Sequence, residues 1–291
     1  MEPRNKKQKR SAMPRDKIPM SSNERVAVIT GGEKGIGFNI AVQLGQSGLF
    51  QHICVTCREE SQVESTVDSL KKKLPPDVKV CSSPLELGDT TSHEDLGTTL
   101  AAMYGKIDVL VNNAGLAYDE DDETPDEEQC SNTLNINFRG TCNLTEELLP
   151  LLRKGSDPRI INVVSEQGHL NQLSKKRQKQ FTAKDLTMEE LFDLMEEYEK
   201  DVQEGNHLDK GWGQSFYGMA DLALVAASQV WAHNEPDITI DCVDPGYCKT
   251  DMTHQKGDRD PAEGAKCVVI PATCENPPTG AFYANNEIAS W

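Results

Sequence analysis

Three glycines with a defined spacing stand near the start of the chain. Gly31, Gly35 and Gly37 follow a short apolar run within residues 30–37, which read T-G-x-x-x-G-x-G and include Ile36. Glycines at these places let the backbone turn tightly and approach a pyrophosphate, and the helix expected after them presents free N–H groups and its positive dipole end. This pattern predicts the binding of a dinucleotide through its phosphates.

A second turn is expected beside the first. Asn113, Ala114 and Gly115 follow the apolar run 107–112. A glycine-rich turn alone is a weak signal, but here it follows a strand, opens a helix and is joined by N-N-A-G at the end of another strand. We therefore expect both turns to contribute to one cofactor site.

Basic side chains indicate which dinucleotide is bound. Lys34 lies within the glycine turn, and Arg58 follows the second apolar run, where the adenosine ribose should rest. Enzymes that use NAD usually carry an acid at the end of that strand for the ribose 2′-OH, whereas a basic residue suits a 2′-phosphate. We predict NADP(H) rather than NAD, with Glu33 beside Lys34 acting against the phosphate. The alternative is that Lys34 and Arg58 are solvated surface charges.

The framework for these turns is an alternation of apolar runs and helix-like stretches from residue 25 onward. Continuous β-branched runs separated by helical stretches indicate strands that are covered on both faces, hence a parallel sheet. We predict a Rossmann-type, doubly wound α/β fold whose strands all end at one edge of the sheet, where ligands bind. The expected strands are 25–30, 52–57, one within 78–87, 107–112, 159–165, 238–243 and 281–284.

The length of the chain, 291 residues with 37% hydrophobic content, suits one domain. We assign this domain to residues 23–291, with a helical insertion at about 166–211 and a disordered basic extension at 1–22. Within the insertion, Thr187 and Glu190 form a capping box that opens an amphipathic helix, and Gly205 is the expected stop signal.

Charge is distributed unevenly along the chain. The formal net charge is −17, but residues 1–20 hold seven Lys/Arg against two acids, a net of +5 that leaves −22 for the rest. An acidic body repels phosphate backbones, so nucleic-acid binding is not expected, although a nuclear-import or nucleic-acid role of the tail stays open. No apolar run approaches the roughly 20 residues that span a bilayer, and no segment has signal-peptide anatomy, so we predict a soluble, cytoplasmic protein.

Two other clusters of side chains have simpler explanations than chemistry. Cys54 and Cys57 form a C-x-x-C inside a predicted strand, which favours buried, reduced thiols over a redox pair or a zinc site, and we predict no metal. Residues 119–128 (DEDDETPDEE) are predicted to be a solvated loop that leads into the helix bearing Asn137. The alternative is an acidic rim that repels anionic substrates.

Most of the sequence, from about residue 20 to 291, resembles the short-chain dehydrogenase/reductase family, and within it the monomeric, NADPH-dependent carbonyl reductases. The long insertion before Tyr217 resembles the helices that cover the oligomerisation face in this subgroup, which implies a monomer. The stretches that carry the resemblance are TGGEKGIG at 30–37, DVLVNNAG at 108–115, NFRGT at 137–141, INVVS at 161–165, GWGQSFYG at 211–218, DPGYCKTDM at 244–252, DPAEGA at 260–265 and the terminal Trp291.

The resemblance implies hydride transfer from a nicotinamide to the carbonyl carbon of a ketone, quinone or aldehyde, with proton donation to the oxygen. Tyr217 is the implied general acid, Ser165 orients the substrate and stabilises the developing alkoxide, and Asn137 holds a water in the proton relay. Glu86, at the end of the third strand, and its neighbour Leu87 are implied to meet the adenine. The residues implied to close over the nicotinamide and pyrophosphate are Pro245, Gly246 and Thr250.

One position departs from the pattern of the family. The family carries Y-x-x-x-K at its active tyrosine, and Asp221 holds the place of the lysine. A unit charge at about 6 Å with an effective dielectric near 20 is worth roughly 3 kcal/mol, or about two pKa units, and an anion reverses the effect of the lysine on Tyr217. A neutral tyrosine can still donate its proton, so a slow reductase and a catalytically silent NADPH-binding sensor or partner protein are both open. Substitution for the missing lysine by Lys249 is a further alternative.

Overall fold

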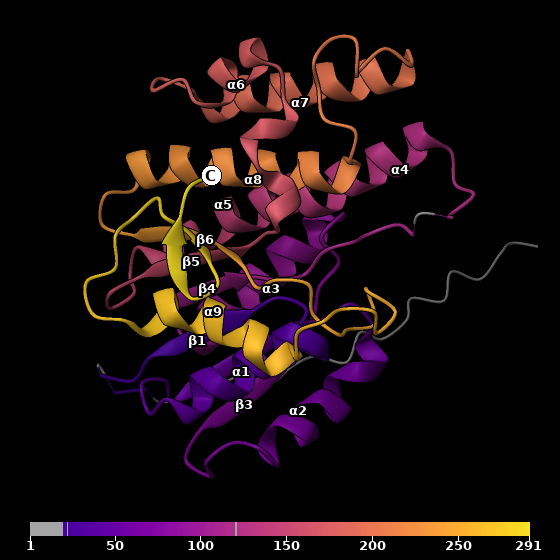
Figure 1. Ribbon diagram of the computed structural model, residues 1–291. Helices are drawn as coiled ribbons and strands as arrows, with labels where there is room; N and C mark the ends of the chain where they lie inside the picture. The colour runs from indigo at the N-terminus through magenta and orange to yellow at the C-terminus, as the bar shows by residue number, and fades with distance from the viewer. Residues whose placement is uncertain (1–19, 22, 120) are drawn as a thin grey trace, which may run out of the picture.

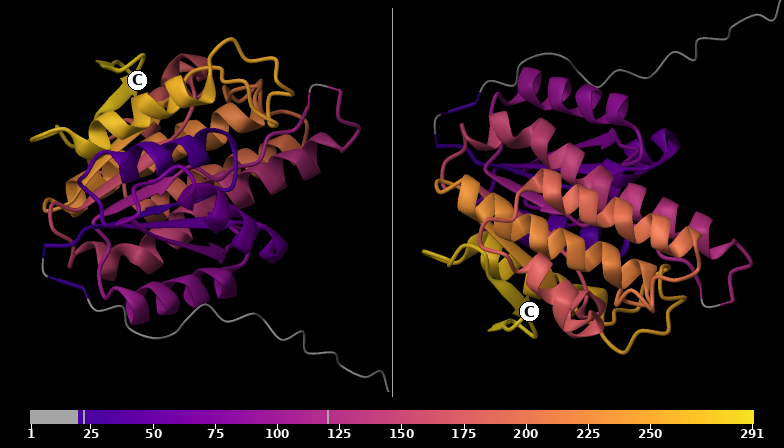
Figure 2. Two further views of the ribbon diagram at one scale, coloured as in Figure 1. Left: turned by 90° about the horizontal axis from the view of Figure 1, so that it is seen from below. Right: turned by 90° about the horizontal axis from the view of Figure 1, so that it is seen from above.

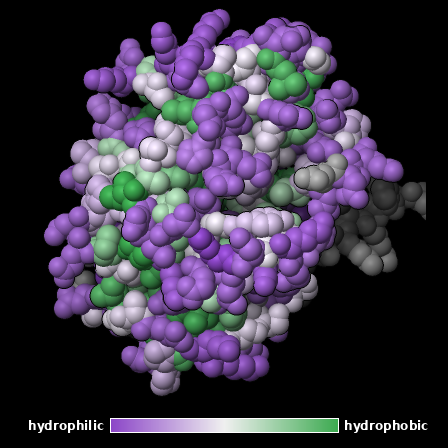
Figure 3. All heavy atoms as spheres, viewed as in Figure 1, coloured by the Kyte–Doolittle hydropathy of each residue, from purple (hydrophilic) through white to green (hydrophobic). Residues whose placement is uncertain are grey.

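The computed structural model describes residues 20–21, 23–119 and 121–291. Residues 1–19 and 22 lie outside the described residues, and with them most of the extension predicted at 1–22. No helix in the described part of the chain is long and apolar enough to cross a membrane. The face seen in Figure 3 is mostly hydrophilic, with hydrophobic side chains in separate patches.

The described residues form an eight-stranded sheet in the order β3-β2-β1-β4-β5-β6-β7-β8 (Figure 1). Neighbouring strands from β3 to β7 are parallel, and β8 pairs antiparallel with β7. All seven expected strands are present, which confirms the predicted doubly wound sheet. The strands are β1 (Val26–Ile29), β2 (His52–Cys57), β3 (Lys79–Pro84), β4 (Val109–Asn112), β5 (Arg159–Val163), β6 (Thr239–Asp244), β7 (Phe282–Ala284) and β8 (Glu287–Ala289).

The edge strand β8 is not predicted by the sequence analysis. A two-residue turn of Asn285 and Asn286, with φ of 52° and 67°, joins it to β7. Asparagine tolerates this left-handed conformation, and such turns match the twist of a hairpin. A three-residue exposed strand has too short a pattern to be read from the sequence, and it exists through its pairing with β7.

Helices cover both faces of the sheet (Figures 1 and 2). Successive residues of a strand point to opposite faces, so Val26 and Val28 join one apolar cluster while Ala27 and Ile29 join the other. The α-helices are α1 (Gly35–Gln46), α2 (Val63–Lys71), α3 (Thr90–Met103), α4 (Asp126–Thr133), α5 (Thr141–Leu152), α6 (Lys175–Phe181), α7 (Met188–Gln203), α8 (Phe216–Asn234) and α9 (Pro261–Thr273). Side chains of α3, α5 and α8 belong to the first cluster, and those of α1, α2 and α9 to the second.

Short helical turns connect these elements near the strand ends. They are the 3-10 helices η1 (Glu60–Gln62), η3 (Glu166–Gly168) and η4 (Leu170–Gln172) and the π-helix η2 (Leu134–Gly140). The acidic run 119–128 is only partly the predicted loop, because Pro125 caps α4 and the helix begins at Asp126. Three acids in the first turn of α4 are favourable beside the positive end of the helix dipole, which explains why this end of the run is helical.

The insertion before α8 lies at one end of the molecule, where α6 and α7 pack outside α8 and α4 (Figure 1). The predicted capping box of Thr187 and Glu190 is present, and Gly205 follows the helix with a φ of 70°. The buried carboxylate of Asp201 accepts hydrogen bonds from Trp212 Nε1 at 2.8 Å and from Lys210 Nζ at 2.6 Å. Because the guanidinium of Arg177 also stacks at 3.7 Å on the Trp212 ring, these polar contacts fasten α7 to the segment before α8.

A chain of buried polar side chains crosses the interior between the sheet and α8. Asn112 at the end of β4 donates to the Asn162 side chain on β5 at 2.8 Å, and Asn162 donates to Ser228 Oγ on α8 at 2.7 Å. Asn112 also donates to Thr145 Oγ1 at 3.0 Å. Asn112 and Asn162 are direct partners in the pairing of β4 with β5, so their amides stand side by side.

The cysteines are free, as the sequence analysis expects for Cys54 and Cys57, which are buried within β2. Among the described residues no group of three or more His, Cys, Asp or Glu side chains could hold a metal ion.

Candidate active site

The carboxyl ends of the parallel strands open into a cavity of about 2160 Å³. Every residue that the sequence analysis selects for the site lines this cavity, although the eighteen positions are spread from residue 31 to 250. The parallel topology accounts for this, because it brings the ends of β1, β2, β4, β5 and β6 to one edge. The eighteen are Gly31, Lys34, Gly35, Ile36, Gly37, Arg58, Glu86, Leu87, Asn113, Ala114, Gly115, Asn137, Ser165, Tyr217, Asp221, Pro245, Gly246 and Thr250.

The glycine turn between β1 and α1 is packed too closely for side chains. A Cβ on Gly37 would lie 2.1 Å from the carbonyl oxygen of Gly31, and Gly31 and Gly35 have φ of 65° and 57°. No side chain caps the first N–H groups of α1. These groups therefore stay available to an anion at the positive end of the helix dipole, so the turn fits the phosphates of a dinucleotide.

The second turn is bonded to the first. Thr30 Oγ1 accepts hydrogen bonds from the backbone N–H groups of Asn113 and Ala114, at 2.9 and 3.0 Å. In return, Asn113 Nδ2 donates to the carbonyl oxygens of Thr30 and Gly31, at 3.0 and 3.2 Å. The ends of β1 and β4 thus form one rigid floor under the cavity. The sequence analysis names Thr30 only as the first residue of the T-G-x-x-x-G-x-G pattern and does not predict these hydrogen bonds.

The basic residues of the adenosine side have different surroundings. Arg58 is exposed just past β2 at the cavity, whereas Lys34 Nζ lies 2.9 Å from Asp251 Oδ2, with both side chains more than half exposed. Asp251 is 217 residues away in sequence, so the pairing is not readable from the motif. Glu86 is exposed beside this region, but the Leu87 side chain is mostly core, with 8% of its surface exposed.

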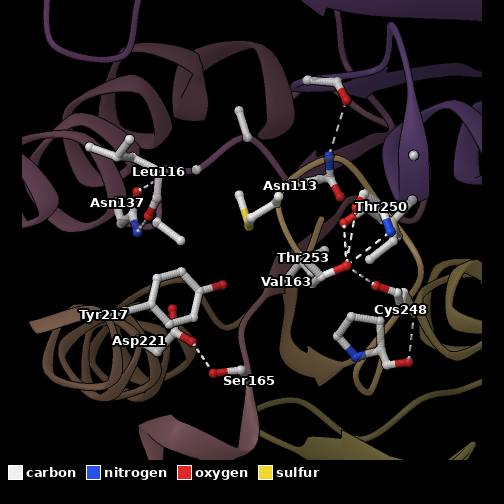
Figure 4. A pocket seen from close by; sticks show the side chains of 18 of the residues that line it. Asn113, Leu116, Asn137, Val163, Ser165, Tyr217, Asp221, Cys248, Thr250 and Thr253 are labelled. Atoms are coloured by element: carbon white, nitrogen blue, oxygen red, sulfur yellow. Dashed lines mark hydrogen bonds between the residues drawn. The ribbon is translucent and has the colours of Figure 1, made fainter. Parts of the chain in front are cut away.

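The segment that closes the cavity, residues 245–256, is held by local hydrogen bonds. Thr253 Oγ1 donates to the carbonyl oxygen of Cys248 at 2.6 Å and accepts from the Thr250 N–H at 3.0 Å (Figure 4). Thr250 itself lies over the glycine turn, since a Cβ on Gly35 would be 3.4 Å from its methyl group. On the other side of the opening, the imidazole of His254 lies 2.7 Å from Asp119 Oδ1. The segment therefore spans the cavity from the glycine turn to the acidic run.

Three polar side chains at the far end of the cavity come from two places in the fold (Figure 4). Ser165 follows β5, and Tyr217 and Asp221 lie one helical turn apart on α8. Ser165 Oγ donates to Asp221 Oδ2 at 2.6 Å, and only 4% of the Asp221 surface is exposed. The Tyr217 hydroxyl points into the cavity.

The oxygen and the nitrogen of the Asn137 side-chain amide, on η2, are both hydrogen-bonded to the backbone of Leu116. Its Oδ1 accepts from the Leu116 N–H at 2.7 Å, and its Nδ2 donates to the Leu116 carbonyl oxygen at 2.8 Å (Figure 4). A π-helical turn widens the backbone there and aims one side chain out of the regular pattern. Asn137 thus fixes the strand-like segment after Gly115 that forms one wall of the cavity.

The carboxyl groups of the site favour their protonated forms. Burial raises the pKa of Asp221 to about 7, and the hydrogen bonds from Ser165 act in the opposite direction. The negative charge of Asp221 raises the pKa of Tyr217 well above its ordinary value, and burial and Asp244 add to that effect. Burial also raises the pKa of Asp244, at the end of β6. Near neutral pH the tyrosine is therefore a neutral hydroxyl, while Asp221 exchanges a proton.

Two further residues, Asp244 and Trp291, contribute to the site. Both belong to the stretches that carry the family resemblance, but the sequence analysis gives them no role. Asp244 Oδ1 accepts from the Gly246 N–H at 2.7 Å and shapes the start of the closing segment. Trp291 Nε1 donates to the carbonyl oxygen of Gly168 at 2.8 Å, and a Cβ on Gly168 would lie 3.0 Å from that of Asp221. The 3-10 turn η3 is thereby pressed against α8 beside Asp221. The stretch D-P-G is a visible signal for the first of these contacts, but nothing local indicates the second.

A doubly wound sheet with a glycine-rich turn, N-N-A-G and a serine–tyrosine pair at the strand ends defines a Rossmann-type oxidoreductase site. The family model described as short chain dehydrogenase matches residues 25–176. The chain is 33% identical to carbonyl reductase (NADPH) 1 of Sus scrofa over 285 residues, which covers 94% of this chain and 96% of that protein. The human protein of the same name is also 33% identical, over 94% of this chain and all of its own length. The chain therefore belongs to the short-chain dehydrogenase family.

Solved structures agree with this assignment. Salutaridine reductase from Papaver somniferum superposes with a TM-score of 0.81 and 31% identity, over 89% of this chain and 99% of that one. Menthone neomenthol reductase from Mentha piperita gives a TM-score of 0.78 and 27% identity, over 91% and 100% of the two chains. The similarity thus extends over about nine tenths of the chain.

Proposed function

We propose that this protein reduces carbonyl groups of small molecules to alcohols with NADPH as the hydride donor. The observation that carries the proposal is that one cavity joins the uncapped N-terminus of α1 to the Ser165 and Tyr217 hydroxyls. The first feature suits a dinucleotide phosphate, and the second suits a carbonyl oxygen that gains charge during reduction. The relatives named for NADPH-dependent carbonyl reduction are consistent with this pairing.

The cofactor would be held by groups from both turns and from the closing segment. Gly31, Ile36 and the N-terminus of α1 would take the pyrophosphate, and Arg58 would take the 2′-phosphate. Lys34 would reach the same phosphate after leaving Asp251, which acts against binding until the phosphate replaces that carboxylate. When bound, the reduced nicotinamide supplies the hydride for the carbonyl carbon.

Side chains of this chain would do the remaining work. Tyr217 and Ser165 would hydrogen-bond the carbonyl oxygen and stabilise the alkoxide, and one hydroxyl of this pair would donate the proton as general acid. Asn137, through Leu116, would keep the wall of the site in place and could accept a water. Asp221 stands where the resemblance expects a lysine, so the usual lowering of the tyrosine pKa is replaced by its opposite. We therefore expect slow turnover.

The proposal also covers assembly and location. Helix α7 packs on α8 and α4. The resemblance implies that the insertion covers the face through which other family members assemble, so we propose a monomer. Free cysteines throughout, including the neighbours Cys54 and Cys81 in the pairing of β2 with β3, suit a reducing compartment such as the cytoplasm.

The alternative function is an NADPH-binding sensor or partner protein without turnover. It is supported by the charge of Asp221, which keeps the Tyr217 proton tightly bound. NADPH oxidation with menadione and a panel of ketones and aldehydes separates the two. We expect a measurable rate that Tyr217→Phe abolishes. A silent wild type together with an active Asp221→Lys would reject the reductase in favour of the binding protein, provided that NADPH binds to both.

A further inference from the structure

The hydrogen bond between Ser165 and Asp221 controls where the serine can direct its proton. A serine hydroxyl has one hydrogen, and at 2.6 Å from Oδ2 that hydrogen is given to the Asp221 carboxylate. With the carboxylate ionised, Ser165 Oγ therefore offers only lone pairs to the cavity. A carbonyl oxygen that accumulates negative charge would find no donor there.

Protonation of Asp221 reverses the direction of this hydrogen bond. The carboxylic acid then donates to Ser165 Oγ, and the serine hydrogen is free to turn to the cavity. Two protonation states of one buried group thus make Ser165 either an acceptor or a donor toward a ligand. This follows from the geometry alone, because Ser165 lines the cavity and is hydrogen-bonded to Asp221.

The groups that face Asp221 favour the acid. Tyr217 lies one turn before it on α8, Asp244 and the Cys242 thiol come from β6, and the backbone of η3 packs against it. On the η3 side, Glu166 raises the pKa of Asp244 and His169 lowers it. The charge that acts on the pKa of Asp221 is thus that of a second carboxylate, Asp244, and burial raises this pKa to about 7.

We propose that Asp221 supplies the proton for carbonyl reduction through Ser165, so that the serine hydroxyl, and not the tyrosine, hands the proton to the substrate oxygen. This rests on the proposed reductase function. As the carbonyl carbon accepts the hydride of the reduced nicotinamide, the C=O electron pair moves onto oxygen and takes the Ser165 proton. Ser165 Oγ recovers a proton from the Asp221 carboxyl, which is left as a carboxylate, and water reprotonates it before the next turnover. Tyr217 remains a neutral hydroxyl that donates a hydrogen bond to the same oxygen.

The rate of reduction must then follow the protonated fraction of Asp221. We expect the single-turnover rate of the wild type to fall about tenfold per pH unit above pH 7. In Asp221→Asn the amide can still donate a hydrogen bond to Ser165 but cannot give it a proton, so the rate should be low at every pH and the fall above pH 7 should disappear. A merely structural role of Asp221 predicts instead a lower rate that keeps the pH dependence of the wild type.

The matched control is Asp241→Asn. Burial raises the pKa of Asp241 to about 7 as well, but this residue lies on β6 outside the cavity and accepts from the Ala281 N–H at 2.8 Å. Its substitution must keep the pH dependence of the wild type. If both substitutions removed the pH dependence of the reduction rate equally, proton transfer from Asp221 through Ser165 would be overturned.

A second readout needs neither cofactor nor turnover. In the full-length protein alone, the infrared C=O absorption of protonated carboxyls should decrease between pH 5 and 9 through both Asp221 and Asp241. The band that is lost in Asp221→Asn and kept in Asp241→Asn is that of Asp221. Ser165→Ala removes a hydrogen bond that lowers the pKa of Asp221, so the band should persist to higher pH.

The two measurements distinguish the possible failures. Carbonyl reduction with a flat wild-type profile, or a band that does not respond to Ser165→Ala, overturns the relay and leaves the reductase intact. A band that behaves as expected in a protein that reduces no carbonyl compound rejects the proposed function and supports the proton exchange between Asp221 and Ser165.

Discussion

Replacing Asp221 by asparagine should stabilise the protein at alkaline pH relative to acidic pH. Asp221 is 4% exposed, and its pKa is raised from 3.8 to about 7, with burial as the largest cause. A carboxyl group whose pKa is higher in the folded state stabilises the fold while both states are protonated. That contribution is lost as the pH rises from 3.8 through 7, because the unfolded chain releases the proton more readily.

The size of the effect follows from the two pKa values. A shift of about 3 units corresponds to about 4 kcal/mol in full. Between pH 5 and pH 8 the wild type should lose about 3 kcal/mol through this group, since part of the change lies below pH 5. Asparagine does not ionise in this range, so it makes no pH-dependent contribution to the free energy of unfolding. Any fixed cost of the substitution is the same at both pH values and cancels.

Urea unfolding of the wild type and Asp221→Asn at pH 5 and pH 8 tests this value. The free energy of unfolding of the variant minus that of the wild type should rise by about 3 kcal/mol at the higher pH. Asp68→Asn, at an exposed site on α2, is the control and should give no such difference. A change below 1 kcal/mol for Asp221→Asn, or a change of opposite sign, would contradict the argument that burial controls this carboxyl.

Three other substitutions test separate parts of the structure. Gly37→Ala places a Cβ 2.1 Å from a backbone oxygen of the glycine turn, so it should cost about 2 kcal/mol and abolish NADPH binding measured by fluorescence, whereas Gly88→Ala, with no atom within 4 Å, should keep wild-type stability. Arg58→Ala should weaken NADPH binding about tenfold while leaving NADH binding unchanged in parallel titrations; equal losses would reject its phosphate role. Asp201→Ala leaves the buried Trp212 Nε1 without its acceptor and removes the buried carboxylate beside Arg177, so it should lower the free energy of unfolding by about 3 kcal/mol; a shift within 0.5 kcal/mol would show that this carboxylate is dispensable.

The sequence predicts those turns, helix caps and strands that depend on a few neighbouring residues. The glycine turn at 31–37 and the capping box at Thr187 each depend on local backbone chemistry, and both are present. Apolar runs likewise identify the seven parallel strands, because strands buried on both faces need such composition. For the site, the same local patterns select residues that line the cavity.

Contacts between distant parts of the chain could not be predicted in this way. Lys34 reads as a phosphate ligand in its motif, yet it is paired with Asp251 across 217 residues. Ser165 and Asp221 were both selected, but their hydrogen bond depends on how η3 packs on α8, 56 residues further along. The pKa of Asp221 has the same origin, since burial is a property of the folded molecule and not of the residues beside it.

The hydrogen-bonded side chains of Asn112, Asn162 and Ser228 help to fix the register of β5 against β4. If β5 slipped by one residue against β4, an amide would face the apolar core with its donors unpaired, at a cost of about 1–3 kcal/mol for each lost partner, and every side chain of the strand would change faces. The two amides thus disfavour any other register of β5 against β4. Asn113 directly follows Asn112, and Ser165 comes three residues after Asn162, so the same register also sets the position of Ser165 relative to the turn at Asn113. A single-residue deletion within β5 should therefore disable the site even if the chain still collapses around an intact core.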